Sequence, residues 1–378
     1  MSHITYPEAI VVGLLQGVSE LFPVSSLGHS VLLPALIGGR WAADLNVSTP
    51  ESPYQAFIVG LHVATAVALL IYFWRDWVRI LRGFGSSIRH RRIEATEERL
   101  AWMIVVATIP VGLTGLALEH TFRTVLGRPV PAAIFLTVNG LVLYGAEMLR
   151  RRSVRASAAV ADAAGSTGAA GSAGSAPVAA TEPDSRAGGW NGTARTSGTP
   201  PHLPEPTGTR PDALAAASPR PQPLAAASTL PGPSETTDTG ETDPLDAADE
   251  RIVAKGFWST TLIGAAQIFA LLPGISRSGV TMAAGLARGL SHEDAARFAF
   301  LLATPVILAA GVLKLPDLFG PMGSGIGGQV LAGSVASGVG AYLAVRFLTR
   351  WFHTRTLTPF AIYCVLAGVA SLVWLGIR

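Results

Sequence analysis

Residues 19–34 read SELFPVSSLGHSVLLP, and they bring Glu20, Ser25, Ser26 and His29 together. The flanking sequences, AIVVGLLQGV before and VLLPALIGG after, are apolar enough to lie in a membrane. A carboxylate, two hydroxyls and an imidazole are unfavourable in that setting unless they have a function. This stretch therefore predicts a polar site held inside a membrane protein.

The composition of the whole chain supports a membrane location. Of its 378 residues, 49% are hydrophobic and only 14% are charged, whereas about a quarter of the residues of a soluble domain are charged. The net charge of +3 is too small to indicate a nucleic-acid partner. A single cysteine, Cys364, excludes a disulfide framework and a cysteine-based metal site. We therefore expect an integral membrane protein.

Six stretches of the sequence are long enough to cross a bilayer as helices. They are residues 54–74, 100–118, 131–149, 298–315, 326–348 and 357–375. Two further apolar segments, 7–37 and 257–290, are interrupted by FPVSSLGHS and LPGISRSGVT. Proline and glycine end helices, and irregular backbone at membrane depth must be buried in protein or line a wet cavity. Both segments are therefore predicted to be re-entrant helix-loop-helix hairpins.

The two interruptions resemble each other, which predicts an inverted repeat. Pro23 and Pro273, like Ser26 and Ser276, are 250 residues apart, and three predicted spans follow each interruption. Because three crossings reverse the direction of the chain, the second half enters with inverted orientation. The predicted fold is an all-α integral membrane protein with six transmembrane helices and two re-entrant hairpins.

Basic residues suggest the orientation of this fold in the membrane. The arginine-rich segments 75–100, 150–155 and 346–355 fall on one side of the predicted topology, and the positive-inside rule assigns that side to the cytoplasm. The first hairpin then opens to the outer face.

Residues 151–252 differ from the rest of the chain. Thirteen of the 26 prolines lie within residues 151–250, among Ala, Ser, Thr and Gly, and large apolar residues are nearly absent. Such a segment cannot bury enough surface to offset its ordering entropy. The expected organisation is a first membrane repeat over 1–150, a disordered cytoplasmic linker over 151–252 and a second membrane repeat over 253–378.

The first interruption could hold a nucleophile and its base. Glu20 lies one helical turn after Gln16, while Ser26 is followed three residues later by His29. A serine near a histidine can act as a nucleophile, and a carboxylate can hold a divalent metal. The alternative is that Ser25 or Ser26 only caps the next helix. Four polar groups at membrane depth favour a functional site over that alternative.

The second interruption, PGISRSGVT at 273–281, adds a cation. Arg277 is an intramembrane arginine, which usually has an anionic partner, and the small residues around it leave room for a phosphate. The alternative is a purely structural pair with Glu20. The residues predicted to bind phosphate are Ser25, Gly274, Ser276, Ser278 and Thr281.

Both motifs, together with FLLATPVILAAGVLKLPDL at 300–318 and TPFAIY at 358–363, resemble bacterial undecaprenyl-diphosphate phosphatases of the bacitracin-resistance type. The resemblance covers roughly 1–150 and 252–378. It implies hydrolysis of undecaprenyl diphosphate to undecaprenyl phosphate, which recycles the lipid carrier for cell-wall synthesis. It also implies a divalent metal, Mg²⁺ or Ca²⁺, and an active site open to the outer face of the plasma membrane.

Residue by residue, the resemblance assigns catalysis to Glu20, Ser26, His29 and Arg277, and metal binding to Glu20 and Gln16. There are two departures from the family pattern, because Gln16 stands where many members have a second Glu and Leu27 where Ser or Thr is common.

The expected partners are a polyprenyl diphosphate lipid and the bilayer, with a homodimer as the candidate assembly and no nucleic acid. A polyprenyl-phosphate transporter or flippase is the alternative function, since inverted repeats with sites at mid-membrane are typical of transporters. Two other polar residues receive structural interpretations. His62 could line the cavity, but it is expected to be a packed, hydrogen-bonded helix residue. Glu147 is expected to extend from a span end to the membrane interface.

Overall fold

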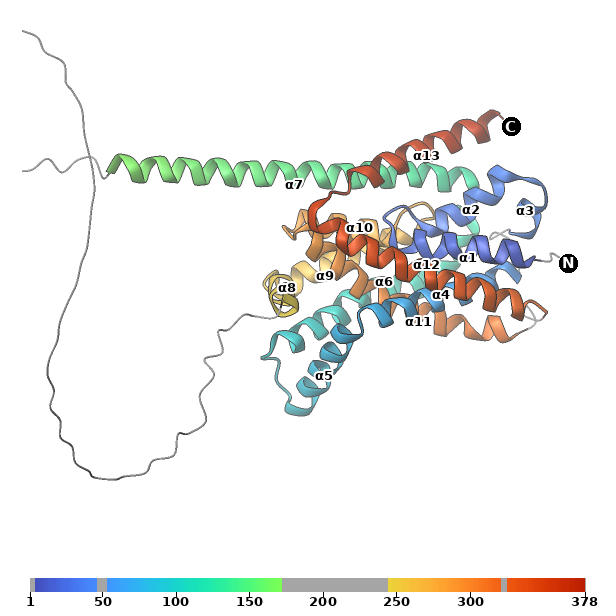
Figure 1. Cartoon of the computed structure of the whole chain (residues 1–378), viewed down its shortest axis with the longest axis horizontal. Coiled ribbons are helices and arrows are strands. Elements are labelled where there is room, and N and C mark those ends of the chain that lie inside the picture. The colour runs from blue at the N-terminus through green and yellow to red at the C-terminus, as the bar shows by residue number, and fades with distance from the viewer. Residues whose placement is uncertain (1–3, 46–52, 172–243, 321–324, 378) are drawn as a thin grey trace, which may run out of the picture. The chain divides into compact units, whose positions relative to one another are not determined.

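The computed structural model describes residues 4–45, 53–171, 244–320 and 325–377, and its regular elements there are helices without a strand (Figure 1). The first half forms α1 (Tyr6–Leu21), α2 (Ser26–Ile37), α3 (Gly39–Asp44), α4 (Pro53–Tyr72), α5 (Trp74–His90), α6 (Thr96–Leu126) and α7 (Pro129–Gly171). The second half forms α8 (Pro244–Val253), α9 (Gly256–Ala265), the 3₁₀ helix η1 (Ala266–Leu271), α10 (Arg277–Ala287), α11 (His292–Phe319), α12 (Gly327–Thr354) and α13 (Thr358–Ile377).

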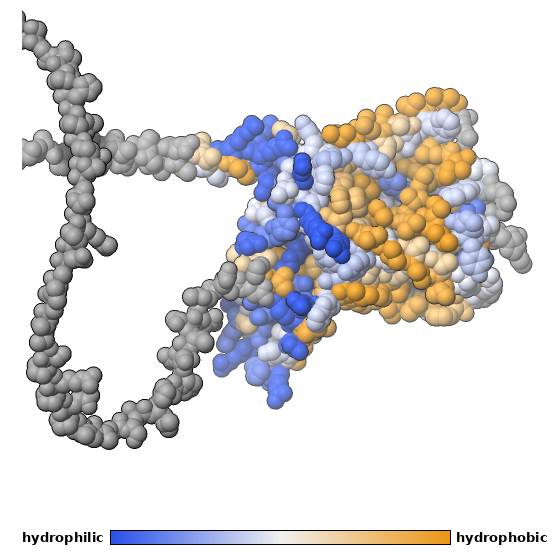
Figure 2. Space-filling model, in the orientation of Figure 1, coloured by the Kyte–Doolittle hydropathy of each residue, from blue (hydrophilic) through white to orange (hydrophobic). Residues whose placement is uncertain are grey.

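Five helices in the described part of the chain are long and apolar enough to cross a membrane, namely α6, α7, α11, α12 and α13. The bent pair of α4 and α5, whose apolar half is α4, supplies a sixth candidate. Each of the six predicted spans coincides with one of these helices to within two residues where it extends beyond the helix. In Figure 2 the hydrophobic surface covers the part of the molecule towards the two chain ends, and hydrophilic surface covers the end where α5 and α8 lie. The all-helical, multi-pass membrane architecture is therefore confirmed.

Both predicted interruptions are breaks between helices. The first break separates α1 from α2, and the second separates η1 from α10. Ser25 caps α2 by accepting from the Gly28 amide at 3.2 Å, and Ser276 caps α10 by accepting from the Gly279 amide at 3.1 Å. Ser25, rather than Ser26, is therefore the structural counterpart of Ser276.

Small residues bring α1 against α12. A Cβ at Gly13 would collide with the backbone of Gly333, and one at Gly17 would collide with the backbone of Ser337. Glycines four residues apart allow helix backbones to touch, which strengthens dispersion contacts in a membrane, where lipid supplies no hydrophobic driving force. This close packing fixes the helix that carries Gln16 and Glu20.

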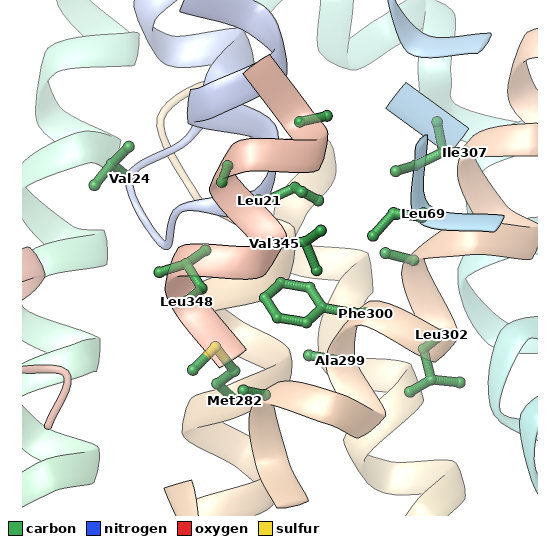
Figure 3. Close-up of a cluster of buried hydrophobic side chains, with 14 of the residues drawn as sticks. Leu21, Val24, Leu69, Met282, Ala299, Phe300, Leu302, Ile307, Val345 and Leu348 are labelled. Atoms are coloured by element: carbon green, nitrogen blue, oxygen red, sulfur yellow. The ribbon is translucent and has the colours of Figure 1, made fainter. Parts of the chain in front are cut away.

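The core joins the two halves of the chain. Figure 3 shows side chains from the first hairpin, α4, α10, α11 and α12 in one buried cluster: Leu21, Val24, Leu69, Met282, Ala299, Phe300, Leu302, Ile307, Val345 and Leu348. Phe300, which is fully buried, lies at the centre of the view. The two break regions are thus held by packing from both halves.

The structure differs from expectation in two segments outside the spans. Residues 74–90 were predicted as an arginine-rich loop but form α5, because apolar residues recur every three or four positions along one side. Both ends of the predicted linker are helical: α7 continues to Gly171, and α8 begins at Pro244. The rest of that prediction, residues 172–243, lies outside the described residues. The chain divides into one unit of residues 1–164 with 242–378 and a second of residues 165–241.

Candidate active site

The two break loops meet in the interior of the protein. The hydroxyls of Ser276 and Ser278 both donate to the Phe22 carbonyl at 3.3 Å. Asn139 of α7 bridges the loops, because its amide nitrogen donates to the Pro23 carbonyl at 3.1 Å and its oxygen accepts from the Ser276 amide at 3.0 Å. The two motifs are therefore in contact, as predicted.

Glu20 is the centre of this polar cluster. Its Oε2 accepts a short hydrogen bond from the Ser26 hydroxyl and a second one, of 3.1 Å, from the Gln16 amide. Its Oε1 lies 3.9 Å from Nη1 of Arg277. The carboxylate, the hydroxyl and the guanidinium that the sequence predicted as one site are therefore together.

The Arg277 guanidinium is incompletely satisfied. Nη1 is buried and has no hydrogen-bond partner, and its distance to Glu20 exceeds that of a hydrogen bond. Buried donors are nearly always paired, so this atom has capacity for an oxygen of a bound anion. Arg277 is also the first residue of α10, where helix amides favour negative charge.

His29 forms no hydrogen bond with Ser26 among those of the described residues. Its Nδ1 lies 2.7 Å from the Ser25 carbonyl oxygen, so Nδ1 carries the proton and donates, and Nε2 lies 2.8 Å from the hydroxyl of Tyr363. Ser26 instead donates to Glu20. Ser26 and His29 nevertheless line the same small pocket, together with Gln16. Nε2 is thus unprotonated, and it accepts a hydrogen bond from the Tyr363 hydroxyl.

The phosphate-binding candidates have protein partners here. Thr281 donates to the Arg277 carbonyl at 2.7 Å, and Ser25 and Ser276 are helix caps. Gly274 adopts φ of +110°, and a Cβ there would collide with the Ala132 carbonyl, so glycine is required by the backbone. Phosphate binding by these residues and by Ser278 stays a prediction.

His62 is a site residue that sequence reasoning underestimated. Its Nε2 lies 3.5 Å from Oε2 of Glu20 and 3.2 Å from Nε2 of Gln16, while Nδ1 bonds the Ile58 carbonyl at 2.9 Å. His62 is hydrogen-bonded within the helix as expected, and the packing of α4 beside α1 also turns its imidazole towards the carboxylate. An intramembrane histidine was the available signal.

Asn139 and Tyr363 were also missed. Asn139 is a lone amide in an apolar span, and its burial with three hydrogen-bond partners shows its bridging role. The prediction that Glu147 extends to the membrane interface was wrong. Glu147 is only 2% exposed and binds His292 at 2.7 Å and Arg151 at 3.1 Å, so partners from α7 and α11 hold it inside the protein rather than at the interface.

Fold and site together define a multi-pass membrane protein with a buried site of carboxylate, hydroxyl, imidazole and guanidinium groups, assembled from both halves of the chain. The family model described as bacitracin resistance protein BacA matches residues 9–184 and 241–370. The chain belongs to this family.

Curated relatives agree with this assignment over their full length. An undecaprenyl-diphosphatase of Mycolicibacterium paratuberculosis is 56% identical over 377 residues, which cover 100% of this chain and 99% of the relative. Undecaprenyl-diphosphatase 1 of Frankia casuarinae is 53% identical, with complete coverage of both chains. An undecaprenyl-diphosphatase of Granulibacter bethesdensis is 34% identical over 97% of this chain and 96% of the relative.

Proposed function

We propose that this protein hydrolyses undecaprenyl diphosphate to undecaprenyl phosphate and phosphate, and thereby returns the lipid carrier to cell-wall synthesis and contributes to bacitracin resistance. The observation that carries the proposal is the buried, unpartnered Nη1 of Arg277 beside the hydrogen-bonded pair of Ser26 and Glu20. Phosphoryl transfer depends mainly on positioning and on neutralising charge, and this group of residues supplies both. The names of the full-length relatives support the substrate.

The first chemical step follows from the hydrogen bond between Ser26 and Glu20. As the Ser26 oxygen bonds to the terminal phosphorus, its proton passes to Oε2 of Glu20. The bond from that phosphorus to the bridging oxygen breaks, and undecaprenyl phosphate leaves with the electron pair. Arg277 neutralises the charge on the phosphoryl oxygens through its planar, bidentate guanidinium.

The second step releases phosphate. Water displaces the Tyr363 hydroxyl from Nε2 of His29 and attacks the phosphoserine, and Nε2 accepts the proton of that water. The bond between phosphorus and the serine oxygen breaks, and Glu20 returns its proton to Ser26. Nε2 is the basic nitrogen of His29 because Nδ1 donates to the Ser25 carbonyl. His29 then gives the proton to the departing phosphate, which restores the neutral imidazole.

A divalent cation, Mg²⁺ or Ca²⁺, fits this site only if the protein and the substrate phosphates coordinate it together. Within the described ranges no group of three or more His, Cys, Asp or Glu side chains could hold a metal ion. Mg²⁺ is commonly bound by one or two carboxylates together with substrate phosphates and water, and Glu20 with the amide oxygen of Gln16 can provide the protein's share. When bound, the ion would neutralise phosphate charge.

The proposed arrangement in the membrane is six spanning helices and two re-entrant hairpins, α1–α2 and α9–α10, related as an inverted repeat. The loops of the hairpins bond to each other, as the tips of opposed hairpins would. The arginine-rich segments, the linker and α8 then face the cytoplasm, and the pocket opens to the outer face. The phosphate-binding residues predicted from the sequence in and beside both loops are expected to bind the substrate. The proposed assembly is a homodimer.

The test is phosphate release from undecaprenyl diphosphate by the purified, full-length protein, with Glu20→Gln as the inactive reference. Release by the unmodified chain and its loss in the variant are expected. If lipid moves across liposomes without phosphate release, the protein is a transporter and the hydrolase proposal fails.

A further inference from the structure

Helix α5 leaves the bundle at a sharp angle. It follows α4 after a single residue, and the two helices are bent by 85° relative to each other. Because α4 is an apolar helix of the membrane region, a helix perpendicular to it runs along the membrane surface. In Figure 1, α5 projects from the bundle at the end opposite the two chain termini.

One face of α5 is occupied by the protein. Asp76, Ile80, Gly83 and Ser87 are buried. Ser87 accepts a hydrogen bond of 2.9 Å from the indole of Trp102 on α6, and a Cβ at Gly83 would press on the backbone of residue 97. The opposite face is therefore the one available to a partner.

That free face carries two parallel rows of side chains. Trp74, Leu81 and Ile88 are 57%, 62% and 54% exposed, and a spacing of seven residues, about two turns, aligns them. The second row follows each of them by one residue and consists of three exposed arginines, Arg75, Arg82 and Arg89.

The charge of this face is not compensated by the protein. Among the described residues, no carboxylate forms an ion pair with any of the three arginines, and the only acidic residue of α5, Asp76, is on the buried side and pairs with Arg297. Arg75 instead lies over the ring of Trp74, 5.5 Å from its centroid. A partner of this face must therefore offer apolar contact beside dense negative charge.

We infer that the free face of α5 is a docking surface for anionic phospholipid headgroups at the membrane surface. Interfacial helices combine an apolar row, often with Trp, and a basic row. Guanidinium groups bind phosphate through two parallel hydrogen bonds. Trp74, Leu81 and Ile88 enter the region of the upper acyl chains, while the arginines bind the phosphates above them. This surface is separate from the pocket and does not depend on the proposed reaction.

The depth of a spin label on α5 tests this inference. Gly85 lies between Leu81 and Ile88 on the same face, and a Cβ there meets no atom within 4 Å, so Gly85→Cys accepts a nitroxide without disturbing packing. The native Cys364 is buried, and the labelled parent chain serves as a blank. The protein is reconstituted in vesicles of phosphatidylcholine alone and in an equimolar mixture with phosphatidylglycerol.

Collisions with oxygen and with a water-soluble nickel chelate report the depth of the label. We expect a deeper label in the mixture than in phosphatidylcholine alone. Each arginine contributes roughly fivefold to binding at an anionic surface, so replacing Arg75, Arg82 and Arg89 by Gln is expected to shift the equilibrium by roughly a hundredfold and abolish the difference.

A matched variant replaces the exposed Arg152, Arg155 and Arg350 by Gln, which removes the same charge from α7 and α12; it is expected to keep the difference. Equal depth in both vesicles overturns the inference, as does loss of the difference in the matched variant. A difference that inorganic phosphate abolishes indicates a free-anion site and also overturns it. A label that stays in water in both vesicles assigns this face to a soluble partner instead.

Discussion

Nη1 of Arg277 lies 3.9 Å from Oε1 of Glu20, so a cation from the second half of the chain faces a carboxylate from the first. The distance is too long for a hydrogen bond and Nη1 has no other partner. The pair holds the site together electrostatically and leaves a donor free for substrate. Catalysis therefore requires that both halves of the chain are folded and packed.

Arg277→Lys is expected to lose activity although the charge is kept. Lysine offers a compact point charge, whereas the guanidinium can hold two phosphate oxygens in one plane. We expect a fall in kcat of roughly a hundredfold or more, measured as phosphate release at matched expression and folding. Turnover near that of the unmodified chain would reduce Arg277 to a structural partner of Glu20.

Removal of divalent metal is expected to stop the reaction. After treatment with a chelator, phosphate release should fall to background and return with Mg²⁺ or Ca²⁺, because a single carboxylate and an amide hold the ion only weakly without substrate phosphates. Glu20→Asp should need a higher metal concentration for half-maximal rate. Unchanged turnover in the thoroughly chelated protein would exclude the shared metal site.

Substitution of His62 separates hydrogen bonding from packing. His62→Leu is expected to lower turnover by roughly tenfold to a hundredfold, the range typical of residues that orient a metal-binding side chain. His62→Gln should retain more, because an amide can still bond Gln16 or Glu20. Equal activity of both variants and the unmodified protein would show that His62 only fills space.

The sequence could predict the chemical groups of the site but not all of their pairings. Glu20 and Ser26 are close in the chain, and Arg277 belongs to the matching break, so both could be found from the polar motifs. The approach of His62 depends on how α4 packs beside α1. The bond from Ser26 to Glu20 rather than to His29 depends on Ser25, whose φ of +69° turns the chain before α2.

The spans were predictable because their length and hydropathy are set by the bilayer. Glu147 was mispredicted because a position near a span end does not reveal a partner, here His292, that lies 145 residues away. The helix α8 was not predicted because it lies at the end of the segment 151–252, whose overall composition indicates disorder. It contains Asp249, which is buried and lies between Arg79 and Arg297.

The burial of Asp249 between Arg79 and Arg297 predicts that the stability of the protein depends on pH. Burial raises the pKa of Asp249 to about 6, against the opposing effect of Arg297 and Arg79. Because the folded state binds this proton more tightly than the unfolded state, the contribution of Asp249 to stability is largest below the unfolded pKa of 3.8 and is lost as pH rises through 6. The steepest slope should be about 1.4 kcal/mol per pH unit.

Thermal unfolding in detergent between pH 4 and pH 7 measures this effect. Asp249→Asn cannot titrate, so the corresponding slope should disappear from its profile, with Glu250→Gln, an exposed neighbour, as the control. A variant profile parallel to that of the unmodified protein would show that Asp249 does not release a proton in this range.

The central claim is that Ser26 and Glu20 act as one catalytic unit, and a double-mutant comparison of phosphate release tests it most directly. Ser26→Ala and Glu20→Gln should each remove most of the activity, and the double variant should be at most about threefold worse than the poorer single variant, because members of a catalytic unit are not additive. Ser25→Ala, which removes the cap of α2 and one predicted phosphate-binding hydroxyl but no reacting group, should lose less. Losses that multiply in the double variant, or wild-type turnover in Ser26→Ala, would contradict the account.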